Sequence, residues 1–220
     1  MVMTDEKILL KAQKEIVRIQ IERLHSVYQS YFKREDTKQL VNFFFDKIYG
    51  MDNNDKFLRI AIDTFQKVKF GLNPTTRENL ETIIRLHEYT GELDGEMGKI
   101  LVEKGWDESK KITIADYRKI YIEFKHGNER VGQLKTVIKC MRIFHAMAHR
   151  PQAESYIKAA KLFARIFGVH SLFTQLEEGY YATVSVKPDV FESFVKEVEA
   201  TEMEYIVSAF PDELNVDTQK

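Results

Sequence analysis

One segment near the start of the chain constrains the fold more than any other. If residues 38–49 form a helix, at about 100° per residue, apolar side chains cover roughly two-thirds of its circumference. These side chains are Leu40, Val41, Phe43, Phe44, Phe45, Ile48 and Tyr49. Only Gln39, Asn42 and Asp46 form a polar stripe. A helix this apolar cannot keep one side in water, so we expect it to run through the middle of the protein.

Helical spacing of apolar residues recurs along almost the whole chain, and only four prolines and ten glycines interrupt it. The first predicted helix starts at Thr4 or Asp5 and ends near Phe32. Further helices are predicted from 52 to 71, from 75 to 91, after Gly91, from 113 to 124, 128–148, 151–168, 171–184 and from 188 onward. No alternating run indicates a strand convincingly. The sequence therefore predicts an all-α fold, a compact bundle of about nine or ten helices.

Length and composition predict one domain. The chain has 220 residues, of which 44% are hydrophobic, and this is enough to bury one substantial core. We expect a single all-helical domain over 1–220, with a frayed polar tail at about 211–220. No segment has the length of a membrane span, and the N-terminus lacks the apolar run of a signal peptide.

Charge and cysteine content narrow the function classes. The 33 Lys and Arg residues balance 34 Asp and Glu residues, so no net field favours nucleic acid or an anionic membrane as a partner. The single cysteine, Cys140, cannot form an internal disulfide and lies among apolar neighbours. A reducing, cytoplasmic location fits this pattern.

Residues Phe43 to Gly50 resemble the signature of the bacterial FFLEELY-motif proteins, in which two phenylalanines, an acidic position, an aliphatic residue and a tyrosine follow one another. The resemblance extends over most of the chain, through 24–28, 92–94 and 150–206. This chain has Phe45, Asp46 and Lys47 where the motif has leucine and two glutamates. The resemblance implies a helical fold and no particular chemistry. We interpret the segment as structural, through Phe43, Phe44, Phe45, Asp46, Ile48, Tyr49 and Gly50.

Two histidines form the first candidate metal site. His145 and His149 are four residues apart, which places both imidazoles on one face of a helix. A zinc peptidase would have a glutamate after the first histidine, and this chain has Ala146. The alternative is a pair of partly exposed histidines near a helix C-terminus, where positive charge is favourable.

Two Glu-x-x-His segments form the second candidate metal site. They are Glu22 to His25 and Glu123 to His126. Diiron carboxylate bundles use two such segments and two further glutamates, which Glu88 and Glu177 or Glu178 would supply. The pattern is short, so it also arises by chance.

An acidic cluster, Glu92, Asp94 and Glu96, lies between glycines. Its spacing resembles the start of a calcium loop, but the later ligand positions do not follow in register. We expect a solvated helix start, with a buried and hydrogen-bonded Asp94 as the alternative.

These observations leave two hypotheses of different class. Phosphate-binding loops, nucleophile elbows, CxxC pairs and dinucleotide fingerprints are absent from the sequence, which lowers the expectation of an enzyme. The leading hypothesis is a non-enzymatic helical protein that binds a protein partner or an apolar ligand, as a monomer or a homodimer. The alternative is a metal-dependent, diiron-like enzyme that uses the Glu-x-x-His segments. Neither hypothesis identifies a cofactor.

Overall fold

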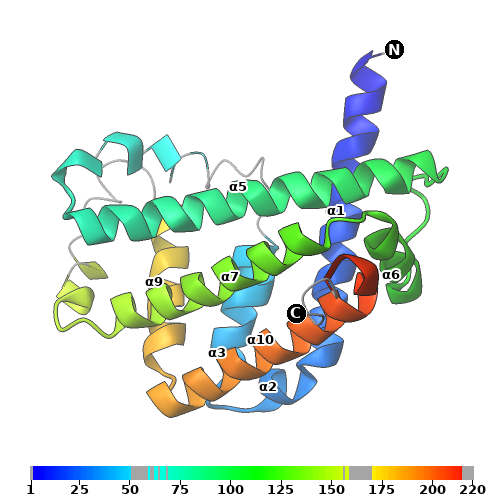
Figure 1. Cartoon of the computed structure of the whole chain (residues 1–220). Helices are drawn as coiled ribbons and strands as arrows, with labels where there is room; N and C mark the ends of the chain where they lie inside the picture. The colour runs from blue at the N-terminus through cyan, green and yellow to red at the C-terminus, as the bar shows by residue number, and fades with distance from the viewer. Residues whose placement is uncertain are drawn as a thin grey trace, which may run out of the picture. The chain divides into compact units, whose positions relative to one another are not determined.

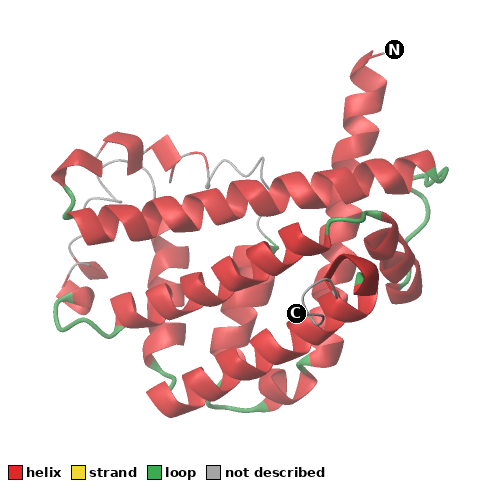
Figure 2. Cartoon of the chain, viewed as in Figure 1, coloured by secondary structure: helices red, strands yellow, loops and turns green. Residues whose placement is uncertain are grey.

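The computed structural model of the protein describes residues 2–50, 59, 62–63, 65–67, 69–155, 157–158 and 170–214. Over these ranges it contains helices, turns and loops and no strand, as Figure 2 shows. The all-α prediction is confirmed. Eleven helical segments occur in the described part, more than the nine or ten expected, because some predicted helices are divided.

The segments follow one another along the chain in the order coloured in Figure 1. They are α1 (Val2–Val27), α2 (Gln29–Lys33), α3 (Lys38–Val41), the π-helix η1 (Asn42–Tyr49), the 3₁₀ helix η2 (Lys69–Gly71), α5 (Pro74–Glu103), α6 (Ile114–Glu123), α7 (Gly127–Ala148), α9 (His170–Val184), α10 (Pro188–Ala209) and α11 (Pro211–Leu214). The helices predicted at 52–71 and 151–168 lie largely outside the described residues. No helix in the described ranges combines the length and the apolar content that crossing a membrane requires.

The chain forms two compact units, and neither is continuous in sequence. Unit 1 comprises Met1–Gln29, Leu86–Val137 and Lys196–Lys220. Unit 2 comprises Ser30–Arg85 and Ile138–Val195. Because α5, α7 and α10 each contribute residues to both units, no cut in the sequence separates one unit from the other. The single domain expected over 1–220 stays a prediction.

The glycines between 91 and 98 do not end a helix. The predicted end at Gly91 is wrong, because α5 continues through Gly91, Gly95 and Gly98 to Glu103. A Cβ atom added at Gly98 would lie 3.0 Å from the backbone nitrogen of Gln13, and the side chain of Gln13 donates to the carbonyl oxygen of Gly91 at 2.8 Å. The glycines therefore let α1 approach α5 closely within unit 1.

Two helix starts show how local sequence sets the boundaries. The helix start predicted at 113 is confirmed, and Thr113 forms a capping box there: its hydroxyl accepts from the Asp116 backbone N–H, and the Asp116 carboxylate accepts from the Thr113 N–H. The start predicted at Thr75 is slightly misplaced. Asn73 is the residue whose side chain accepts from the Thr76 N–H, with Pro74 in the first turn, where its missing N–H costs nothing.

A short helix follows α10 where the sequence predicted the start of a frayed tail. Residues 211–214 form α11, and the Glu213 carboxylate accepts from the Gly127 N–H at 2.6 Å, at the start of α7. A carboxylate at a helix N-terminus is favoured by the helix dipole. The fraying predicted at about 211–220 stays a prediction, since 215–220 lie outside the described residues.

Candidate functional site

Four charged side chains are buried in the described part of the chain, and all four belong to unit 1. Arg23, Asp94 and Arg130 are 3%, 1% and 5% exposed, and Glu15 is 8% exposed. Lys, Glu, Arg and Asp are almost never fully buried unless they are paired. Their partners therefore define the candidate site.

Arg23 is paired with Glu202, which joins α1 to α10. Its guanidinium donates to the Glu202 carboxylate, and the Tyr28 hydroxyl donates to the same carboxylate at 2.9 Å. Burial alone would lower the pKa of Arg23, but the charge and hydrogen bond of Glu202, together with Tyr117 and Tyr205, outweigh it and the pKa is raised. Burial and then Glu202 raise the pKa of Tyr28. Both groups therefore keep their protons near neutral pH.

Tyr205 on α10 lies beneath two guanidinium groups. The Cζ atoms of Arg23 and Arg118 are 4.2 and 4.3 Å from its ring centroid. Arg118, on α6, donates to the Tyr205 carbonyl oxygen and to the Ser208 hydroxyl, both at 2.9 Å. The Tyr205 hydroxyl is buried without a hydrogen-bond partner among the described residues. Cation–π contacts of this kind are stronger where water is excluded.

Arg130 on α7 is the second buried arginine. Its two terminal nitrogens lie 3.4 Å from Oδ1 of Asp94, and one of them donates to Oε1 of Gln133 at 2.8 Å. Its Cζ atom also lies over the rings of Tyr121 and Phe124, at 5.3 and 5.2 Å from their centroids. Arg130 thus ties α5 to α6 and α7 within unit 1.

Tyr117 connects the two halves of this network. It is 1% exposed, and burial raises its pKa well above the usual range, although the charge of Arg130 opposes the rise. The charges of Arg23 and Asp94 also act on it. Burial likewise raises the pKa of Tyr121. We call these side chains the arginine–tyrosine cluster: Arg23, Tyr28, Asp94, Tyr117, Tyr121, Arg130, Glu202 and Tyr205.

The arginine–tyrosine cluster is suited to holding helices in one arrangement. Its charges form opposite pairs, and its tyrosine pKa values are shifted away from neutrality, so these hydroxyls are poor general bases. Removing one member would leave another charged or polar group buried and unpaired. The cluster therefore stabilises the packing of α1, α5, α6, α7 and α10 inside unit 1.

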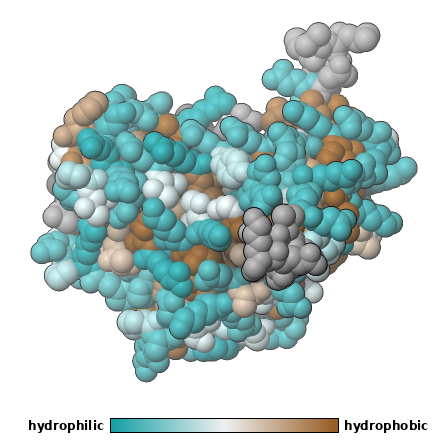
Figure 3. Space-filling view, in the orientation of Figure 1, coloured by the Kyte–Doolittle hydropathy of each residue, from teal (hydrophilic) through white to brown (hydrophobic). Residues whose placement is uncertain are grey.

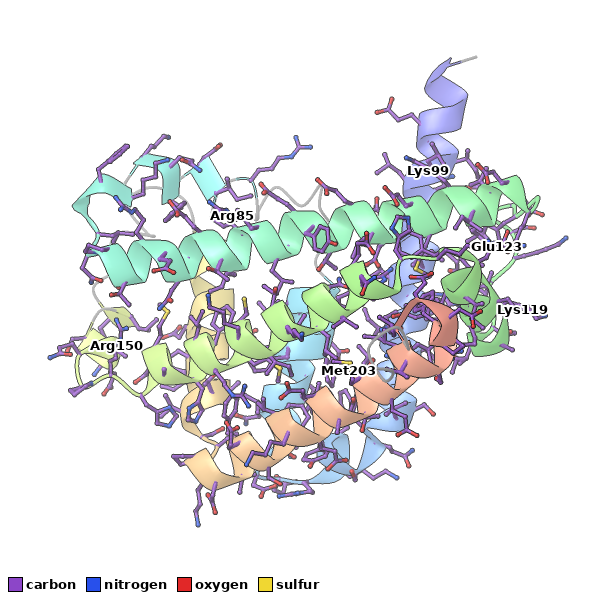
Figure 4. All side chains as sticks on the ribbon, viewed as in Figure 1. Arg85, Lys99, Lys119, Glu123, Arg150 and Met203 are labelled. Atoms are coloured by element: carbon purple, nitrogen blue, oxygen red, sulfur yellow. The ribbon has the colours of Figure 1, made fainter. Side chains whose placement is uncertain are left out.

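The Glu-x-x-His segments do not form a site in the structure. Glu123 is the last residue of α6, and Lys125 has a φ of 53°, so His126 lies beyond the helix and not on one helical face with Glu123. Glu123 pairs with Lys104, and Figure 4 shows it on the outer side of α6 near Lys119. Glu22 accepts from Arg18 at 2.7 Å.

The described residues contain no group of three or more His, Cys, Asp or Glu side chains that could hold a metal ion. The four residues predicted as diiron ligands, Glu22, His25, Glu123 and His126, are thus not brought together as a metal-binding set. Glu123 and His126 do not share a helix face, because Lys125 between them has a left-handed backbone conformation.

His145 and His149 do lie side by side, with ring centroids 4.1 Å apart. The Nε2 atom of His145 is buried and has no hydrogen-bond partner in the part of the chain that the structure describes, and its ring stacks on Phe191 with centroids 4.0 Å apart. A metal ion could not reach that nitrogen without displacing the ring. We therefore assign no metal to this pair.

The acidic cluster is divided between two sides of α5. Glu92 and Glu96 are exposed, whereas Asp94 is buried against Arg130. The expected solvated helix start is wrong, since these residues lie in the interior of α5. The alternative, a buried and hydrogen-bonded Asp94, describes the structure.

The Phe43 to Gly50 segment lies in unit 2, mostly within the π-helix η1. Phe43, Phe44 and Phe45 are buried, and their rings contact Phe144 on α7 and Phe194 on α10. A Cβ atom added at Gly179 on α9 would overlap the ring of Phe43. Ile48, Tyr49 and Asp46 are half-buried, and Gly50 is exposed. The phenylalanines pack against three neighbouring helices of the unit.

One helix of unit 2 carries large apolar side chains on its outer face. Tyr181 and Val184 on α9 are 49% and 38% exposed and three residues apart. The Tyr180 ring meets the Tyr181 ring edge-on, with centroids 5.2 Å apart. Glu178, three residues before Tyr181, is also exposed. We call Glu178, Tyr181 and Val184 the α9 face.

The sequence prediction missed the arginine–tyrosine cluster, although a signal for it exists. Two of its charged members occupy positions on apolar helical stripes: Arg23 follows Ile16 and Ile19 at helical spacing, and Glu202 lies between Val198 and Ile206. Either a charged residue at such a position is buried with a partner, or that side of the helix does not face the core. Only the fold identifies the partner.

Comparison with known proteins gives a family and no activity. A protein-family model described as "Domain of unknown function (DUF8198)" matches residues 2–214. No curated protein and no solved structure matches the chain.

Proposed function

Because the chain belongs to the DUF8198 family, whose description names no activity, we propose its function from its surface: it binds a protein partner through the α9 face and catalyses no reaction. Tyrosine is enriched at the energetic centres of protein interfaces, since it buries a large area at a small loss of side-chain freedom. The observation that carries the proposal is the exposure of Tyr181 next to Val184. The Tyr180 ring contacts the Tyr181 ring edge-on.

The partner we propose carries apolar side chains next to a basic one. Tyr181 and Val184 offer apolar area, and Glu178 places a negative charge one helical turn away. Such a charge contributes more to the rate and specificity of association than to affinity.

The pKa values of the cysteine and of the buried tyrosines support a binding role, because these groups stay protonated near neutral pH. Burial raises the pKa of Cys140 to about 11, so its thiol is uncharged near neutral pH and a weak nucleophile. The tyrosines of the arginine–tyrosine cluster are likewise held protonated. The buried thiol also supports a cytoplasmic location, which remains part of the proposal.

The resemblance to the FFLEELY-motif proteins is also part of the proposal. We propose that 43–50 is this chain's form of the bacterial FFLEELY motif, with Phe45, Asp46 and Lys47 as substitutions. The burial of three consecutive phenylalanines supports a packing role for the motif.

The test places a photoreactive amino acid at position 181 of the full-length protein in cells. We expect it to crosslink one recurrent protein partner. The variant Tyr181→Ala/Val184→Ala shortens both apolar side chains of the α9 face. It should weaken binding of that purified partner by about tenfold or more, equivalent to ~1.4 kcal/mol. Glu178→Lys should slow association most at low salt.

The matched control removes similar side chains elsewhere. Ile122 and Val207 in unit 1 are 44% and 38% exposed, so Ile122→Ala/Val207→Ala loses comparable exposed apolar area. This variant should bind the partner normally. Labelling of a small apolar molecule in place of a protein, or equal weakening by both double variants, would contradict the proposal.

The metal-dependent alternative has its own test. Elemental analysis of untagged protein expressed with iron, manganese and zinc available should find none of them near one per chain. A stoichiometric metal that is lost in Glu22→Gln or His25→Gln would instead support an enzyme built on the Glu-x-x-His segments.

A further inference from the structure

Three rings form a continuous stack inside unit 2. The centroid of the His145 ring on α7 lies 4.1 Å from that of His149, the residue that follows the helix, and 4.0 Å from that of Phe191 on α10. The His145 and His149 planes are tilted by 34°. The His145 and Phe191 planes are 13° apart, so the rings face each other. The stack links the C-terminal end of α7 to the first turn of α10.

The His145 imidazole is held where a proton is poorly accommodated. Its Nε2 atom is buried and has no hydrogen-bond partner among the described residues. Burial lowers the pKa of His145, and the neighbouring His149 lowers it further. A proton added at Nε2 would place positive charge on a half-buried ring beside a second basic ring.

Among the described residues, Glu192 is the charged group that acts on His145 besides His149. Glu192 on α10 opposes the lowering of the His145 pKa. However, the Glu192 carboxylate already accepts from Arg142 on α7, at 2.7 Å. Movement of Glu192 toward a protonated His145 would weaken this ion pair. Protonation therefore acts mainly on the His145–Phe191 contact between α7 and α10.

We propose that the His145–His149–Phe191 stack is a proton-sensitive latch, closed at neutral pH and opened by mild acid, which controls the packing of α7 against α10 in unit 2. Opening means that the His145 ring leaves Phe191 to reach water and that the α7–α10 contact loosens locally. This inference is independent of the proposed partner binding.

The direction of the pH effect follows from the lowered pKa. An unfolded or locally opened chain takes up a proton near the ordinary histidine pKa of about 6.5. The closed state takes it up only at lower pH. The open state therefore binds more protons as the pH falls below about 6.5, and the closed state loses stability over that range.

The first test follows each histidine of the full-length protein by NMR titration. We expect His145 to titrate below the ordinary histidine range and to shift upward in His149→Asn, which removes the neighbouring basic ring. A His145 that titrates at or above the ordinary value would overturn the latch.

The second test measures hydrogen exchange in 138–148 and 188–195 at about pH 7.5 and about pH 5.5, with rates corrected for intrinsic exchange. The wild type should lose protection in both segments at the lower pH. His145→Phe keeps an aromatic ring at position 145 without a titrating group there, and His145→Gln keeps a polar side chain of smaller size. The proposal predicts that neither loses protection on acidification.

The control is His126→Gln in unit 1, which should lose protection in 138–148 as the wild type does. Equal loss of protection in wild type, His145→Phe and His145→Gln would show that another group is responsible, and would overturn the proposal.

Discussion

At the scale of single residues, stability depends most on positions where a contact in the folded unit permits only one kind of side chain. Gly179 leaves room for the ring of Phe43, and Arg23 neutralises the buried Glu202 carboxylate. Neither role follows from the residue type alone. Both come from what lies opposite in the folded unit.

Gly179→Ala should destabilise the protein by about 1–3 kcal/mol, because the added methyl overlaps the ring of Phe43 in a packed interior. Gly132→Ala is the matched control, since nothing lies within 4 Å of a Cβ atom added at this position in α7. It should stabilise the protein by ~0.5–1 kcal/mol through helix propensity. Urea unfolding measures both. Equal effects of the two substitutions would refute the contact.

Arg23→Met should destabilise the protein by about 3–5 kcal/mol, since it leaves the Glu202 carboxylate buried without its positive partner. Arg34→Met, which breaks an ion pair with Asp36 whose side chains are 46% and 50% exposed, should cost less than ~1 kcal/mol. Thermal unfolding of the two variants in the same buffer gives the comparison. A loss below ~1 kcal/mol for Arg23→Met would mean that the pair is not buried in solution.

At the scale of elements, local sequence sets where several helices begin, and packing overrides it elsewhere. The capping box at Thr113 starts α6 as predicted, whereas α5 runs through three glycines because α1 lies against them. The π-helix η1 is a similar case. Its apolar composition predicted a helix but did not predict that the helix would be of the π type. Its phenylalanines pack on α7, α9 and α10.

Thr113→Ala should destabilise the protein by ~0.5–2 kcal/mol, because the Asp116 N–H loses its acceptor at the start of α6. Thr136→Ala is the control. The Thr136 hydroxyl only bonds back to the Gly132 carbonyl within α7, so alanine there should be neutral or slightly stabilising. Hydrogen exchange at Asp116 should rise in the first variant alone. An unchanged rate would show that the cap does not hold in solution.

At the scale of the whole molecule, the division into two discontinuous units makes distant parts of the chain depend on each other. Unit 1 is completed only by 196–220, which supplies Glu202 to Arg23, Tyr205 to the arginine–tyrosine cluster and Glu213 to the start of α7. The N-terminal helix therefore lacks its charged partner until the C-terminal segment has been made.

Truncation tests this dependence. A chain that ends at Val195 should lose cooperative unfolding, since Arg23, Tyr28 and Gly127 all lose partners. A chain that ends at Leu214 keeps every one of these contacts and covers the residues matched by the family model. It should unfold like the full chain. Circular dichroism during thermal unfolding distinguishes the two, and a cooperative transition in the shorter chain would contradict the interdependence.

The sequence by itself determined the fold class and much of the helix order. Periodic apolar residues require helices, and capping residues or prolines at 113 and 188 mark where helices start, because these signals act within a few residues of the chain. It also placed 43–45 on an apolar segment. The candidate metal ligands were chosen by the same short-range spacing, and spacing along one helix says nothing about what lies opposite.

The tertiary structure alone decided the rest. It showed that Asp94 faces Arg130, that Arg23 faces Glu202, that glycines in α5 and α9 meet Gln13 and Phe43, and that Tyr181 is left on the surface. These facts depend on contacts between residues far apart in sequence. Burial makes an unpaired charge or an overlapping atom costly, so the partners across the fold, and not the local pattern, determine each residue's role.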